Sequence, residues 1–116
     1  ILTFSTHRVK EAEPIIVGLL RDNEIAIRYA AASGLIHFKN SNAIRILQEI
    51  LLLRASTIKA KGFDANKIYG LKINILNALR LNKWTALNDT LKKLIVEDKN
   101  LKIISNARDL LNQLKN

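Results

Sequence analysis

The amino-acid sequence predicts an all-α fold, an α-α superhelix (solenoid) of about three antiparallel helix pairs. One observation is a pattern that occurs twice at a constant offset: Asp22, Ile27, Ala31 and Leu35 correspond to Asp98, Ile103, Ala107 and Leu111. A weaker copy lies between them, with Leu71, Ile75, Leu79 and Asn66 in the Asp position. Copies about 40 residues apart are typical of stacked helical repeats. The second observation is composition: Leu, Ile, Ala, Lys and Asn dominate, with only four Gly and one Pro, which favours helices over strands.

The first repeat, about residues 1–39, is expected to contain two helices. Ser5 or Thr6 can cap a helix that runs to about Leu20, and Pro14 should kink it because proline removes a backbone donor. A turn at 22–24 leads into a second helix over about 24–37. Its predicted apolar face consists of Ile27, Ala30, Ala31, Gly34 and Leu35, whose small members allow close helix approach.

The second repeat, about residues 40–82, contains an insertion. A helix over about 42–53 has apolar residues dense enough to predict burial on two sides. Residues 54–65 then form a connection longer than the other two turns within repeats, interrupted by Ser, Thr, Gly and Asp. Such insertions project as loops and often bind ligands, so this loop is predicted to be the most mobile internal segment. A helix over about 66–82 follows.

The third repeat, about residues 83–116, is predicted to have helices over about 84–97 and 100–114, joined by a tight turn at Glu97–Lys99. No composition shift marks a boundary, so residues 1–116 are expected to form a single domain. The chain has no Met and begins with Ile1, which suggests an excised or processed piece.

These residues resemble the HEAT repeat, a pair of antiparallel helices A and B. The family pattern places a proline in helix A, Leu-Leu before the turn, Asp in the turn and Val-Arg in helix B. Here the matching residues are Pro14, Leu19, Leu20, Asp22, Ile27, Arg28, Ala31 and Leu35. The resemblance implies that the turn Asp and the helix-B Arg bond between successive repeats. The second repeat has Asn66 and Lys72 in those positions, and the third has Asp98 and Ile104.

The charge is distributed unevenly along the chain. The formal net charge is +9, and residues 54–116 contain thirteen Lys and Arg against five Asp and Glu. Within 54–83 only Asp64 opposes a cationic cluster of Arg54, Lys59, Lys61, Lys67, Lys72, Arg80 and Lys83. This cluster predicts an anionic partner near the middle repeat, and a merely solubilising surface is an equally good interpretation.

Catalytic and cofactor-binding patterns are not found in the sequence. His7 and His37 are far apart and lack a second ligand at metal spacing, and there is no cysteine. The carboxylate pairs fall at expected helix ends, where capping explains them. We therefore expect no enzyme, no metal and no cofactor. No apolar run is long enough for a membrane span, and a cytoplasmic location is the default expectation.

The favoured function is a non-enzymatic scaffold with a basic surface for an acidic peptide or protein. Its candidate contact residues are Arg28, Lys59, Lys61, Lys67, Tyr69, Lys72 and Trp84. Reversal of the four lysines to Glu is predicted to abolish binding with little effect on stability. Trp84 can stack on a partner or fill the space between repeats, and Tyr69 can face either solvent or core. The alternative function is binding of nucleic-acid phosphates. An enzymatic HEAT-like protein, such as an alkylated-base glycosylase or a bilin lyase, is a third and weaker hypothesis.

Overall fold

The computed structural model describes residues 6–54 and 63–114, and these residues form helices without strands. The six α-helices are α1 (Thr6–Leu19), α2 (Ile25–Gly34), α3 (Ile44–Leu51), α4 (Ala65–Asn82), α5 (Asn88–Glu97) and α6 (Leu101–Leu114). Two short 3₁₀ helices, Leu35–Phe38 and Ser41–Ala43, connect α2 to α3. The predicted all-α class is confirmed for the described residues.

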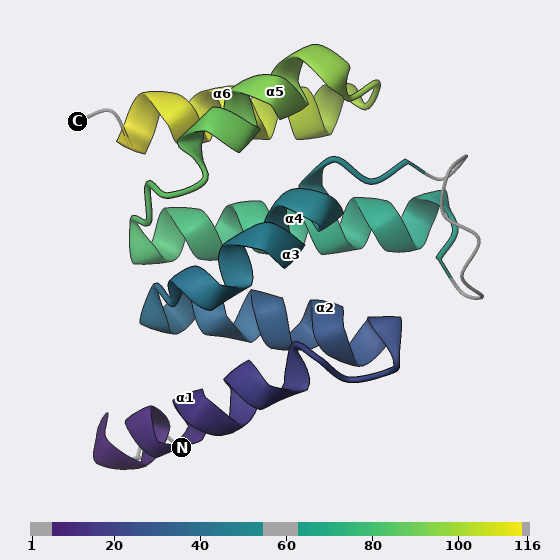
Figure 1. Ribbon diagram of the computed structural model, residues 1–116. Coiled ribbons are helices and arrows are strands. Elements are labelled where there is room, and N and C mark those ends of the chain that lie inside the picture. Colours follow the sequence, from purple (N-terminus) through teal and green to yellow (C-terminus); the bar gives the residue numbers. More distant parts are fainter. Residues whose placement is uncertain (1–5, 55–62, 115–116) are drawn as a thin grey trace.

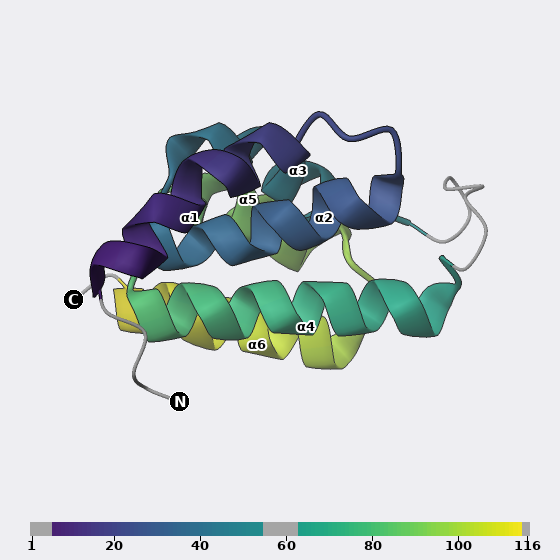
Figure 2. The same cartoon turned by 90° about the horizontal axis from the view of Figure 1, so that it is seen from below.

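The helices lie in two layers. Three tiers, α1 with α2, α3 with α4 and α5 with α6, follow one another across the molecule in Figure 1. In the view from below, the odd-numbered helix lies above the even-numbered helix within each tier, α1 above α2, α3 above α4 and α5 above α6 (Figure 2). The third tier contacts the second within each layer, from α3 to α5 and from α4 to α6, whereas α2 of the first tier contacts both α3 and α4. Each tier therefore buries its apolar side against the next.

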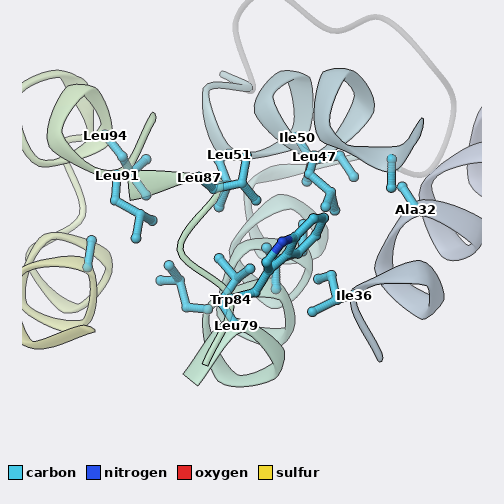
Figure 3. Packing of buried hydrophobic residues seen from close by; sticks show 14 of the residues in the cluster. Ala32, Ile36, Leu47, Ile50, Leu51, Leu79, Trp84, Leu87, Leu91 and Leu94 are labelled. Atoms are coloured by element: carbon cyan, nitrogen blue, oxygen red, sulfur yellow. The ribbon is translucent and has the colours of Figure 1, made fainter. Parts of the chain in front are cut away.

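A single hydrophobic cluster runs through all three tiers. Its members include Tyr29 and Leu35 from the first tier, Leu47 and Leu76 from the second, and Leu91 from the third. Trp84 is only 8% exposed, and its indole lies among Ile36, Leu47 and Leu79 (Figure 3). The prediction that Trp84 fills the space between repeats is confirmed.

The two connections between tiers have the same backbone conformation. Lys39 and Lys83 are left-handed, with φ of 50° and 51°. The N–H of Lys39 donates to Ile36 O and that of Asn40 to Leu35 O, while Lys83 donates to Arg80 O and Trp84 to Leu79 O. This pair of bonds is the Schellman motif, which ends a helix by satisfying its last carbonyls. The same turn, at Lys39 and at Lys83, therefore connects each tier to the next.

Several predicted boundaries and core residues are wrong. α5 begins at Asn88 instead of residue 84. The turn at Lys83 directs the Trp84 side chain into the core, and residues 84–87 are not helical. Ile27 is 38% exposed and Ala30 is exposed, although both were predicted to be core residues. The buried side of α2 instead contains Tyr29 and Ala32, and Ala31 is 5% exposed as predicted.

Two other expectations concern α1 and the insertion. Pro14 lies inside α1, and a kink there stays a prediction. The expected mobile loop falls largely on residues 55–62, which lie outside the described residues. At its end, Phe63 is 8% exposed and contacts Tyr29 edge-on, with ring centroids 5.7 Å apart. None of the described helices is long and apolar enough to cross a membrane.

Candidate functional site

A groove of about 420 Å³ opens at one edge of the stack, between the second and third tiers. The N-terminus of α4 lies on the same side of the molecule as the α1–α2 and α5–α6 turns (Figure 1). The groove is formed there by the end of α3, the first turns of α4 and the α5–α6 turn. Its walls are mainly apolar, and they include Leu51, Leu52, Leu53, Ile68, Leu94 and Ile103. We refer to this cavity as the edge groove.

The polar part of the edge groove centres on a buried ion pair. Lys72 Nζ lies 2.6 Å from Asp98 Oδ2, and the two side chains are 7% and 9% exposed. Asp98 follows α5 in an extended conformation, and its other oxygen, Oδ1, accepts the N–H of Asn100 at 2.7 Å. Both carboxylate oxygens therefore have partners. Lys72 has three N–H donors and gives one of them to Asp98.

This ion pair joins successive tiers at the positions where the HEAT resemblance implies a bond. Lys72 occupies in α4 the position that Arg28 occupies in α2, and Asp98 occupies the turn position of Asp22. Arg28 behaves differently, since its Nη1 donates to the carbonyls of Asp22 at 2.8 Å and Asn23 at 3.2 Å within its own tier. The Asp22 carboxylate accepts the N–H of Glu24 at 2.9 Å. Of these two cations, Lys72 thus bonds to the next tier, whereas Arg28 stabilises a turn within its own tier.

The interpretation of Lys72 as an exposed contact residue is therefore wrong. Lys72 lies on the side of α4 that faces α6 and the α5–α6 turn, so its ammonium contacts Asp98 instead of solvent. Its reversal to Glu would place two carboxylates together in a buried site, which contradicts the expected small effect on stability. Trp84 is likewise buried and presents no face for stacking on a partner.

The remaining predicted contact residues are spread over the molecule. Lys67 is exposed on α4, and its backbone N–H donates to the capping carboxylate of Asp64 at 2.8 Å. Tyr69 is half-buried and lines the edge groove with Lys72. Arg28 lies in the first tier, away from both. Lys59 and Lys61 lie outside the described residues.

A second polar cluster covers the outer side of the layer formed by α2, α4 and α6. Arg80 donates from Nε to Gln113 at 3.0 Å, and from its terminal nitrogens to Asn77 and Asn106 at 3.4 Å. The exposed or half-buried polar residues of α4 and α6 include Lys67, Asn74, Asn77, Arg80, Lys102 and Asn106. We call these six residues the even-helix face. They combine three cations with three amides.

Tyr29 of α2 belongs to the core of the structure. It is 1% exposed, and its hydroxyl donates to Glu49 Oε2 at 2.6 Å. Burial, and then the hydrogen bond and the negative charge of Glu49, raise the pKa of Tyr29 well above its ordinary value. Tyr29 therefore ties α2 to α3 and has no surface available for a partner.

The edge groove was only partly predicted. Lys72 and Tyr69 were singled out from sequence as contact residues, whereas Asp98 and Lys99 were predicted only as turn residues. The offset that relates Arg28 to Lys72 was a signal that Lys72 could pair with the next turn Asp. Among the described residues, no group of three or more His, Cys, Asp or Glu side chains could hold a metal ion.

Comparisons with protein-family models, with curated protein sequences and with solved structures found no match to this chain. Arguments about function consequently depend on the two polar surfaces described above.

Proposed function

We propose that this chain is part of a HEAT-like α-α superhelix that acts as a non-enzymatic protein-binding module, with an acidic peptide or protein as its partner. The observation that carries the proposal is the repeated geometry. Two equivalent Schellman turns, at Lys39 and Lys83, and the Lys72–Asp98 bond between tiers are features of a stack that adds one helix pair at a time.

The exposed residues of the first tier also support a superhelix. Ile15, Leu19 and Ile27 are 69%, 39% and 38% exposed. The third tier also exposes large apolar residues, Val96 at 82% and Leu101 at 79%. Exposed apolar side chains are what a helix pair inside a longer stack presents to its neighbour.

The even-helix face is the surface we assign to the acidic partner. Lys67, Arg80 and Lys102 provide positive charge, and amides beside them can donate to carboxylates and peptide carbonyls. Arg80 is held by three side-chain hydrogen bonds, so it loses less conformational freedom on binding than an unconstrained arginine.

The proposal is tested with a fluorescein-labelled oligoglutamate peptide and fluorescence anisotropy. Lys67→Glu/Lys102→Glu reverses two charges of the even-helix face, and Lys92→Glu/Lys93→Glu makes the same change of net charge on α5. We expect the first variant to lose binding and the second to retain most of it. Equal weakening by both variants would mean that net charge, and no particular face, binds the peptide.

Nucleic-acid binding is the second candidate, and the excess of Lys and Arg in residues 54–116 favours it. The same assay with labelled duplex DNA and single-stranded RNA distinguishes the two functions. Phosphate binding falls steeply with salt, because each neutralised phosphate releases a counterion. Tighter binding of either nucleic acid than of oligoglutamate at about 0.15 M salt would favour this alternative.

A further inference from the structure

We propose that the edge groove is a binding site for a small monocarboxylate with an apolar body. This ligand site is separate from the surface proposed for the protein partner. The edge groove lies where α4 begins and α5 meets α6, whereas the even-helix face consists of solvent-facing residues along α4 and α6. The two sites can therefore be tested independently.

The size and walls of the edge groove suit a small apolar molecule. Its volume of about 420 Å³ falls within the range of small-molecule sites. Leu52, Ile68 and Ile103 belong to three different helical regions and face the same cavity. An apolar ligand body placed there leaves water for a leucine- and isoleucine-lined wall, which is favourable in proportion to the area removed from water.

The polar end of the edge groove suits an acceptor. Lys72 is more than nine-tenths buried, lines the cavity and gives only one described hydrogen bond, to Asp98. An ammonium has two further donors, and an oxygen of a bound ligand can accept one of them. Each Asp98 oxygen already accepts one hydrogen bond, Oδ2 from Lys72 and Oδ1 from the Asn100 N–H.

The charge of the site favours an anion. Three cationic side chains, Arg54, Lys72 and Lys99, line the edge groove together with two carboxylates, Glu97 and Asp98. Arg54 and Glu97 face each other at 3.9 Å at the exposed rim, and Lys99 is exposed beside them. The described lining residues therefore carry a net charge of plus one, and a single carboxylate neutralises it. A cationic head group of the same size would add to the excess.

The first experiment compares three ligands with the same ten-carbon chain, decanoate, decan-1-ol and decyltrimethylammonium. Isothermal titration calorimetry with the full chain, below micelle-forming concentrations, gives the three affinities. We expect decanoate to bind at least about tenfold more tightly than the other two, a difference that corresponds to one favourable charge interaction. Equal affinities, or no decanoate binding at millimolar concentration, would overturn the proposal.

The second experiment locates the site with variants that keep the buried ion pair. Leu52→Glu places a charge on the groove wall, and Leu81→Glu makes the same change at a position that is 76% exposed outside it. Lys99→Glu and Lys93→Glu form a second matched pair, of which only Lys99 lines the groove. We expect Leu52→Glu and Lys99→Glu to lower the affinity for decanoate by about tenfold, and both control variants to bind decanoate as tightly as wild type.

Circular dichroism of each variant checks that it is folded. If Leu52→Glu loses its helical signal, the Lys99 and Lys93 pair still decides the question. Decanoate affinity that changes alike in Lys99→Glu and Lys93→Glu would place the ligand elsewhere and refute the assignment.

Discussion

Lys72 is held against Asp98 with both side chains more than nine-tenths removed from solvent. The two charged groups lose hydration on folding. Their mutual attraction and the hydrogen bond that the Asn100 N–H donates to Asp98 offset that loss. A buried pair of this kind adds little stability over apolar residues, but either partner alone would be strongly unfavourable. Its main effect is to favour one alignment of the second tier on the third.

We expect Lys72→Met to lower the free energy of unfolding by about 3–5 kcal/mol, because it leaves the Asp98 carboxylate buried without a cation. The double variant Lys72→Met/Asp98→Asn should lose less free energy of unfolding than Lys72→Met and Asp98→Asn lose together. Urea denaturation measures all three variants. Lys67→Met, on the exposed side of the same helix, is the control and should stay within about 0.5 kcal/mol of wild type. A similar loss in Lys67→Met would mean that the ion pair has no special role.

Tyr29 provides a prediction about pH. Tyr29→Phe removes the hydrogen bond to Glu49 and should cost about 1 kcal/mol near neutral pH. The raised pKa of Tyr29 keeps the native hydroxyl protonated above pH 10, while the unfolded tyrosine ionises near its ordinary value of about 10. The stabilisation is therefore present below pH 10 and declines as the pH rises further.

Urea denaturation at pH 7 and above pH 10 checks this expectation. The difference in free energy of unfolding between wild type and Tyr29→Phe should shrink at the higher pH. A difference that grows with pH would show that the hydroxyl is not buried as described.

At the scale of the elements, the two turns between tiers decide where each tier begins. Lys39 and Lys83 adopt left-handed backbone conformations that glycine adopts without steric cost. The chain uses lysine at both positions, so each turn retains some strain. The Schellman bonds and the burial of Trp84 directly after Lys83 hold the second turn in place.

Lys83→Gly should raise the free energy of unfolding by about 0.5–1 kcal/mol, because it removes the Cβ that disfavours a positive φ. Lys83→Ala keeps the Cβ and should show no such gain. Thermal and urea unfolding compare the three proteins, and Lys39→Gly should behave like Lys83→Gly. A loss of stability in both glycine variants would contradict the left-handed turns.

The packing of α2 is tested by two neighbouring alanines. Ala31 is 5% exposed and Ala30 is exposed, so Ala31→Glu buries a charge without a partner whereas Ala30→Glu does not. We expect Ala31→Glu to cost several kcal/mol, on the order of 3, and Ala30→Glu to remain near wild type. Thermal melting followed by circular dichroism distinguishes them. The opposite order would mean that the side of α2 facing the core is assigned wrongly.

At the scale of the whole molecule, charge and shape act together. The net charge of +9 is distributed over a molecule whose longest dimensions are 40 and 39 Å, so like charges repel across its surface. This repulsion opposes folding and also attracts anions. Salt weakens both effects, because the screening length shortens to about 8 Å at 0.15 M.

We therefore expect the free energy of unfolding in urea, which is uncharged, to rise by up to about 1 kcal/mol between low and physiological salt. Lys92→Glu/Lys93→Glu lowers the net charge by four, from +9 to +5, and should reduce this gain. A fall in stability with salt would mean that attractive surface pairs outweigh the net repulsion.

The repeated pattern of Asp, Ile, Ala and Leu was enough to predict helices and tight turns, because these depend on local spacing and capping. α4 and α6 agree with their predicted ranges to within a residue, since long periodic segments have unambiguous faces. α2 and α5 agree less well. Their ends depend on a left-handed lysine and on the burial of Trp84, and neither follows from periodicity.

The sequence by itself determined the helical class, the basic charge and the small buried positions Ala31 and Ala107, because composition and three-and-four spacing are properties of the chain alone. Only the tertiary structure decided which cations reach solvent. Lys67 and Lys72 lie on one helix, yet packing of α4 against α6 and the α5–α6 turn buries Lys72 and leaves Lys67 exposed. The edge groove exists only where two tiers meet, so no single segment could predict it.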